Sequence, residues 1–349
     1  MKRDGKRFEN LDVLRGSLAI LVMIYHLCIW ESLNCPKVLM VAGPYSVCSF
    51  FLLSGLSLSF VYDGRFFNSR QIIKYAISRC FRIYPLLWIV ITTVLLIIYS
   101  NGDHVGWKII SINYLGIFSF VKPECYINCG AWSVGNEIVF YTIFPLAIFI
   151  FRSSAWAGFF LLFSSVVGKF IFLYLANEMD FSRDIPWNLY VNPLNNLHFF
   201  ILGMFIYFNK DYFRSIKRPC FSLLFSIFLF FISQVVFNFP IYINIFIVDS
   251  LLAVIVSSIF ILKEPSKINI LYVVGFQSGL VSYGIYLIHP LSYNFVKWFL
   301  FILDFDGPFA AISLSVFLTF IASFVIYKYI EAPIISLGKY LSFKFYSAT

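Results

Sequence analysis

The first hydrophobic segment carries two residues that could do chemistry inside a membrane, Arg15 and His26, at positions separated by eleven residues. At about 100° per residue, this spacing returns the chain to nearly the same face of an α-helix. The two side chains then lie roughly 16 Å apart along the axis, about half of a ~30 Å hydrocarbon core. Ionisable groups at such depth are costly and usually functional. We therefore expect a fixed cation and a titratable imidazole on one helix face.

Arg79 and Arg82 lie at the start of a later hydrophobic segment, in the sequence ISRCFRIYPLLWI. Their i, i+3 spacing places both guanidinium groups on one side of a helix. Arginine suits phosphate because its planar fork binds pairs of oxygen atoms. The alternative is that these charges only set the orientation of the chain in the membrane.

Glu137 and His289 are two further ionisable residues within apolar segments. A carboxylate at the depth expected for Glu137 needs a partner or takes up a proton. His289 precedes Pro290, which removes a backbone donor and favours a break or kink in the helix. Taken alone, Glu137 could serve only an interhelical hydrogen bond, and His289 only helix packing.

The elements that must position these residues are membrane helices. The chain has 349 residues, of which 60% are hydrophobic and 12% are charged, whereas soluble domains carry about 25% charged residues. Apolar runs of suitable length predict an all-α, polytopic membrane helix bundle of about ten transmembrane helices. The runs lie near residues 11–30, 44–62, 83–99, 133–151, 155–176, 196–208, 219–237, 240–262, 271–296 and 310–330.

We expect a single membrane domain over residues 1–349 with short cytoplasmic tails at 1–10 and 331–349. Residues 106–120 could form an interfacial or re-entrant segment. The first apolar run lacks a small-residue cleavage site and is expected to be a retained helix rather than a signal peptide.

Lysine and arginine predict the orientation of the chain. Most of the 26 basic residues fall in alternate connecting segments, together with the N-terminus, and such segments are usually cytoplasmic. This bias predicts that the N- and C-termini are both cytoplasmic, which requires an even number of helices. The net charge of +9 is then mainly a feature of the inner face and does not indicate a nucleic-acid partner.

In this topology three titratable side chains from three different helices reach a similar depth in the outer half of the membrane. They are His26, Glu137 and His289. We expect His26 to act as a general base on a hydroxyl group. Glu137 would orient the imidazole ring and stabilise the imidazolium, as the carboxylate does in a catalytic triad.

The three arginines, Arg15, Arg79 and Arg82, gather at the opposite, cytoplasmic level. This two-ended layout suits an acyl-CoA donor. Its phosphates would stay at the basic inner mouth, and its thin pantetheine arm would carry the thioester between the helices. A hydroxyl acceptor would approach from the outer side.

Other polar residues are expected to have less specific roles. Lys169 lies about seven residues from the outer end of its segment and is expected to snorkel outward. Asp249 lies in the middle of a segment and should pair with a polar neighbour or line a cavity. His104 and His198 are expected to be structural.

The seven cysteines give no metal-binding spacing, and with four dispersed histidines we expect no metal site. Cys125 and Cys129 lie in a predicted outer loop, and Cys35 lies in another. A disulfide among them could form in an oxidising compartment.

At these residues the chain resembles the acyltransferase-3 family of integral membrane O-acyltransferases. The segment LDVLRGSLAILVMIYH is similar to the opening Arg-x10-His motif, and SRCFRIYPLLWI to the Arg-x-x-Arg-Ile-Tyr-Pro run. The segment AWSVGNEIVFYTIFP is similar to the family segment whose first glutamate falls on Glu137. Three further motifs match FFLLSGLSLSF with its Ser54–Gly55 step, SYGIYLIHPL with His289, and IEAPIISLGK with Glu331 and Pro333.

The resemblance implies a core of ten helices, an acyl-CoA donor that is commonly acetyl-CoA, and acylation of extracytoplasmic glycans such as O-antigen. It implies a multi-pass protein of the bacterial cytoplasmic (inner) membrane, with a glycan or lipid-linked sugar and membrane lipid as partners. Ile138 and Val139 stand where the family motif has glutamate and glutamine. The family type without a C-terminal esterase-like domain is expected, which favours direct transfer to the sugar. Glu331 is expected to be a structural cap.

Two other functions fit part of the pattern. A transporter or flippase of lipid-linked sugars would also have intramembrane charges and many helices, although obvious paired inverted repeats are not detected. A non-catalytic membrane sensor or scaffold is the third alternative.

Overall fold

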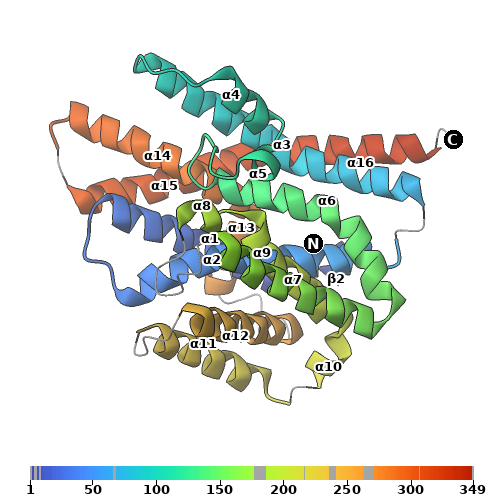
Figure 1. The fold of residues 1–349 in the computed structure, drawn as a ribbon. Helices are drawn as coiled ribbons and strands as arrows, with labels where there is room; N and C mark the ends of the chain where they lie inside the picture. The colour runs from blue at the N-terminus through green and yellow to red at the C-terminus, as the bar shows by residue number, and fades with distance from the viewer. Residues whose placement is uncertain are drawn as a thin grey trace. The chain divides into compact units, whose positions relative to one another are not determined.

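The structure is a computed structural model that describes residues 2–3, 6–7, 9–65, 68–176, 186–215, 217–235, 241–262, 270–305 and 307–347. Figure 1 shows that its helices dominate the described chain. Two short strands, β1 (Lys2–Arg3) and β2 (Lys6–Arg7), pair in antiparallel fashion. The helices are α1 (Glu9–Trp30), α2 (Lys37–Tyr62), α3 (Ser69–Ser100), α4 (Trp107–Tyr114), α5 (Phe118–Val121), α6 (Ala131–Ser153), α7 (Ala155–Ala176), α8 (Trp187–Tyr190), α9 (Pro193–Phe208), α10 (Lys210–Arg214), α11 (Pro219–Val235), α12 (Ile241–Ile261), α13 (Ile270–Leu280), α14 (Ser282–Ile302), α15 (Pro308–Ile326), the π-helix η1 (Tyr327–Glu331) and α16 (Ala332–Ser347).

The prediction of a polytopic all-α bundle is confirmed. In the part of the chain that the structure describes, each predicted apolar segment overlaps a helix or two consecutive helices. Within the described residues, seven helices are long and apolar enough to cross a membrane by length and composition, and two shorter apolar helices lie at Pro219–Ser233 and Ile247–Ile261. The orientation of the termini stays a prediction.

One segment differs from the expectation, and the structure adds detail at two others. The run at 271–296 is interrupted at Val281, between α13 and α14, whereas α14 continues through Pro290. A proline costs one backbone hydrogen bond, but α14 is held along its length by packing against α15. Residues 106–120 hold the short helices α4 and α5. The expected tail at 331–349 is helical over Ala332–Ser347.

The chain divides into two compact units. Unit 1 comprises Met1–Val22, Cys35–Asp63 and Thr142–Leu280, and unit 2 comprises Met23–Asn34, Gly64–Tyr141 and Val281–Thr349. Helix α1 therefore contributes its first part to unit 1 and its last turns to unit 2.

Unit 1 is organised around the close packing of α2 against α9. A Cβ atom at Gly55 would collide with the carbonyl oxygen of Phe200, and one at Gly203 would collide with the carbonyl oxygen of Leu52. The two glycines thus let the helix backbones approach each other, as small residues commonly do between membrane helices. Helix α7 packs on α9, and α11 packs on α12.

Unit 2 is organised around α14, which packs on α15, and α3, which packs on α16. Gly284 of α14 lies against Ser323 of α15, and Gly338 of α16 lies against the Phe81 ring of α3. Ile285 and Leu287 of α14 have no exposed surface. This packing fixes the rotation of α14 and hence the direction of the polar side chains that it carries.

The contact between α2 and α9 gives a stability prediction. We expect Gly203→Ala to lower the stability of the protein by about 1–3 kcal/mol, because the new methyl group overpacks a backbone contact. Gly168→Ala on α7 is the matched control, since a Cβ at Gly168 would meet no atom within 4 Å. Thermal unfolding in one detergent measures both variants. Equal midpoints for the two would contradict the described packing.

Candidate functional site

The structure brings together the two histidines that the sequence singled out, both in unit 2. Nδ1 of His26, on α1, lies 3.0 Å from Nε2 of His289, on α14. Their ring planes differ by 11°, with centroids 5.1 Å apart. His289 is fully buried, whereas His26 is partly accessible. We call these two residues the histidine pair.

The second nitrogen of His289 determines where the protons of the pair lie. Nδ1 of His289 is 3.1 Å from the carbonyl oxygen of Ile285. A carbonyl only accepts hydrogen bonds, so this Nδ1 carries the proton, and Nε2 of the neutral ring is an acceptor. His26 must then donate from its Nδ1. Its own Nε2 keeps a lone pair, which is the state that a general base requires.

Aromatic side chains cover the histidine pair. The Trp30 ring stacks on His26 with centroids 5.3 Å apart and on His289 with centroids 5.8 Å apart. Tyr293 lies against Trp30, at 5.0 Å between centroids. A π face next to an imidazole favours its protonated form. Trp30 was not among the residues predicted from the sequence, although its position four residues after His26 places it on the same helix face.

Glu137 belongs to the same unit and makes a local contact on α6. Its Oε2 accepts a hydrogen bond of 3.1 Å from the hydroxyl of Tyr141, one turn further along α6. The Arg79 guanidinium lies over the Tyr141 ring, 5.8 Å from its centroid. Within the described residues, the hydrogen bond of the His26 ring goes to His289 and not to Glu137. A second imidazole thus contacts Nδ1 of His26, and the role of Glu137 in orienting this ring stays a prediction.

A polar stripe on α14 connects the level of Arg82 with the level of the histidine pair. It consists of Tyr283, Tyr286 and His289, at a spacing of three residues that makes each one the neighbour of the next on the helix surface. The Tyr283 hydroxyl donates to the carbonyl of Ile83, at 2.8 Å, and interacts electrostatically with Arg82. Tyr283 and His289 are six residues apart, so the stripe rises by about 9 Å.

Two other polar contacts complete this part of unit 2. Ser133 of α6 donates a hydrogen bond of 2.8 Å to the Tyr286 hydroxyl. Glu331 of η1 is buried, with 6% of its surface exposed, and interacts electrostatically with Arg82. Glu331 was predicted from the sequence to be a structural cap. The structure adds an electrostatic interaction between Glu331 and Arg82, one of the candidate phosphate-binding arginines.

Arg15 lies in unit 1, whereas Arg79 and Arg82 lie in unit 2. Nη2 of Arg15 donates a hydrogen bond of 3.2 Å to Oγ of Ser57, which lies in the segment FFLLSGLSLSF. Arg79 and Arg82 lie on consecutive turns of α3. A clamp formed by all three arginines stays a prediction.

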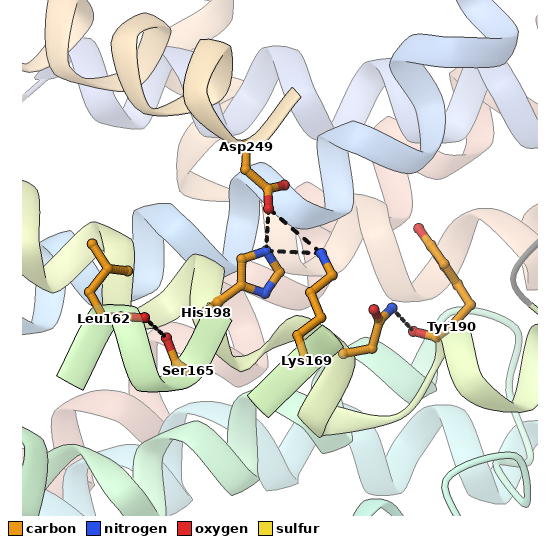
Figure 2. A network of polar contacts seen from close by, with 7 residues as sticks. Leu162, Ser165, Lys169, Tyr190, His198 and Asp249 are labelled. Carbon is orange, nitrogen blue, oxygen red and sulfur yellow. Dashed lines mark hydrogen bonds and ion pairs between the residues drawn. The ribbon is translucent and has the colours of Figure 1, made fainter. Parts of the chain in front are cut away.

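Unit 1 contains a polar network that differs from the sequence expectation (Figure 2). Lys169 is buried, with 4% of its side chain exposed, and lies 3.7 Å from the Asp249 carboxylate. His198 lies 2.9 Å from the same carboxylate oxygen. The prediction that Lys169 snorkels outward is wrong, because a buried acid on another helix neutralises it. The prediction that Asp249 pairs with a polar neighbour is confirmed.

The seven cysteines are free, so the disulfide that Cys125, Cys129 and Cys35 allowed is not formed. In the part of the chain that the structure describes, no group of three or more His, Cys, Asp or Glu side chains could hold a metal ion.

Comparison with known proteins adds to the geometry. The model of the family described as "Acyltransferase domain", acyltransferase-3, matches residues 8–328. The "Putative acetyltransferase ORF330" of Acidianus two-tailed virus is 28% identical over 287 residues, which cover 80% of this chain and 81% of that protein. No solved structure matches the chain. Because the family model covers far more than half of the sequence, the chain belongs to the acyltransferase-3 family.

Proposed function

We propose that this protein is a membrane O-acyltransferase, and specifically an O-acetyltransferase, of the bacterial cytoplasmic membrane. It moves the acyl group of cytosolic acetyl-CoA, or another short acyl-CoA, to a hydroxyl of an extracytoplasmic or lipid-linked surface polysaccharide. The observation that carries the proposal is the hydrogen bond between Nδ1 of His26 and Nε2 of His289. Membership of an acyltransferase family supports the reaction class.

In this proposal His26 is the general base and His289 is the residue that positions it. The acceptor hydroxyl gives its proton to Nε2 of His26 while its oxygen forms a bond to the thioester carbonyl carbon. The resulting imidazolium is held by His289 and faced by the Trp30 ring. When the carbon–sulfur bond breaks, His26 returns the proton to the leaving sulfur. The products are an ester and the free thiol of CoA.

His289 takes the role that a carboxylate has in a catalytic triad, but without a formal charge. Its anchor is the Ile285 carbonyl, one turn earlier on the same helix. Glu137 acts at longer range, through its hydrogen bond with Tyr141. The Tyr141 ring is in turn covered by the Arg79 guanidinium group. We assign Glu137 a positioning role rather than proton transfer.

The donor would bind along α14, with its phosphates at the arginines. Arg79 and Arg82 present two guanidinium groups at the lower end of the polar stripe, and such forks bind phosphate oxygens in pairs. The stripe of hydroxyl groups above them offers hydrogen bonds to the polar groups of a pantetheine arm.

The reaction itself is tested with membranes, labelled acetyl-CoA and the native glycan. We expect His26→Ala to lower label transfer by at least about 100-fold, because loss of a general base commonly costs 10²–10⁴-fold. His104→Ala, in a loop where the ring packs on Tyr99, is the control and should transfer label normally. Undiminished transfer by His26→Ala contradicts the proposal. Translocation of the glycan without acyl transfer would favour the transporter.

The positioning role of His289 is tested by two substitutions. His289→Gln can keep an acceptor atom near the place of Nε2, whereas His289→Ala cannot. We expect His289→Ala to lower kcat by about 100-fold, since His26 then loses its preferred tautomer. His289→Gln should recover at least a tenth of the native kcat, and KM for acetyl-CoA should change little in both. Equal losses in the two variants would assign His289 to packing alone.

The donor site is tested by CoA binding to the purified protein in lipid nanodiscs. We expect Arg79→Ala and Arg82→Ala each to weaken CoA binding by about 10-fold. A hydrogen bond to a charged group contributes about 1.5–3 kcal/mol, and in the variants water replaces part of that contribution. Arg214→Ala is the control, because this exposed arginine pairs with Asp211 on α10. Unchanged affinity in both α3 variants would remove this part of the proposal.

A further inference from the structure

Unit 1 holds a second cluster of ionisable side chains, apart from the histidine pair. Lys169 of α7, His198 of α9 and Asp249 of α12 meet from three apolar helices (Figure 2). Nε2 of His198 lies 2.9 Å from Oδ2 of Asp249 and 3.1 Å from Nζ of Lys169. The lysine and histidine side chains are 4% and 1% exposed, and the aspartate side chain is 16% exposed.

A role in stability alone explains this cluster poorly. Two opposite charges in an apolar interior lose hydration, and apolar residues of similar volume often replace such pairs without loss of stability. The surroundings are apolar as well. The centroid of the Phe199 ring lies 4.0 Å from that of the His198 ring and 5.2 Å from Nζ of Lys169. Within membrane helices, groups of this kind commonly bind or relay protons.

The geometry around His198 also favours a role in binding or relaying protons. A ring nitrogen has either one proton to donate or one lone pair with which to accept. If Nε2 carries a proton, it donates to Asp249, and Lys169 can then form a hydrogen bond with Nε2 only as a neutral amine. If Nε2 has no proton, it accepts from the Lys169 ammonium group and loses its hydrogen bond with Asp249. One proton therefore has two positions, on Nζ or on Nε2, and the carboxylate lies beside both.

Among the described residues, the other titratable groups near the cluster come from α2 and α8. Tyr45 interacts electrostatically with Asp249, and Cys48 with both Lys169 and Asp249. Tyr190 of α8 in turn contacts Cys48. Phenol and thiol groups are neutral near pH 7, so the exchangeable proton belongs to the three residues of the cluster.

We propose that Lys169, His198 and Asp249 form a proton-binding site within unit 1, which takes up and releases one proton. With its proton count unchanged, the site passes a proton from the ammonium group to the imidazole, giving a neutral amine and an imidazolium. Uptake of one further proton leaves both groups charged beside the Asp249 carboxylate. Because Asp249 is the residue through which α12 joins the two others, proton uptake changes the bonding between these helices.

The site is tested by ¹⁵N NMR of histidine-labelled protein in lipid nanodiscs, with His198→Gln identifying the His198 signals. In the native chain we expect the Nε2 signal of His198 to move between its protonated and unprotonated positions as the pH is changed within the stable range. In Lys169→Met the competing donor is gone, so the signal should stay at the protonated position over the same range. Lys297→Met, which removes the lysine paired with Glu31 in unit 2, should leave the native titration unchanged.

A His198 signal that does not move with pH in the native chain would overturn the proposal, whether or not any variant folds. So would a titration in Lys169→Met identical to the native one. A double variant, Lys169→Met with Asp249→Leu, separates fold from proton binding. It should unfold within a few degrees of the native protein but lose the pH-dependent shift of His198. Because none of these signals depends on acyl transfer, the result stands apart from that of His26→Ala.

Discussion

The hydrogen bond between Nδ1 of His26 and Nε2 of His289 is the constraint on which the candidate site depends. It forms only if the last turns of α1 lie beside the middle of α14, with each helix turned so that its imidazole faces the other. The close packing of Gly284 on α15 holds α14 in that rotation. The Ile285 carbonyl fixes the proton on the far side of His289. Together these contacts leave Nε2 of His26 as the basic atom.

Much of the fold could be predicted from the sequence, because apolar runs long enough to cross a membrane have few alternatives to a helix. The break at Val281 could not, since local sequence pointed to Pro290 instead. A proline removes one hydrogen bond at a known place, but whether the helix bends there depends on what packs beside it. That information lies in α15, far along the chain.

The candidate site, like the fold, could be predicted from the sequence only in part. The spacing of Arg15 and His26 indicated a functional helix face, and depth in the membrane placed His289 near His26. The partner of each ionisable group could not be predicted in this way. Depth alone made Glu137 a reasonable partner of His26, yet it bonds to Tyr141. Lys169 could reach the interface by its length, but a carboxylate on α12 lies closer. Partners depend on the rotation of helices about their axes, which a single sequence specifies weakly.

The most direct test of the central claim, that an acyl-CoA thioester meets Nε2 of His26, is alkylation by bromoacetyl-CoA followed by mass spectrometry. The reagent resembles the donor and places an electrophilic carbon next to the position of the thioester. The geometry predicts a single adduct on Nε2 of His26, suppressed by an excess of CoA, because Nδ1 is engaged with His289. Labelling that CoA does not suppress, or a CoA-protected adduct elsewhere with His26 unmodified, would contradict it.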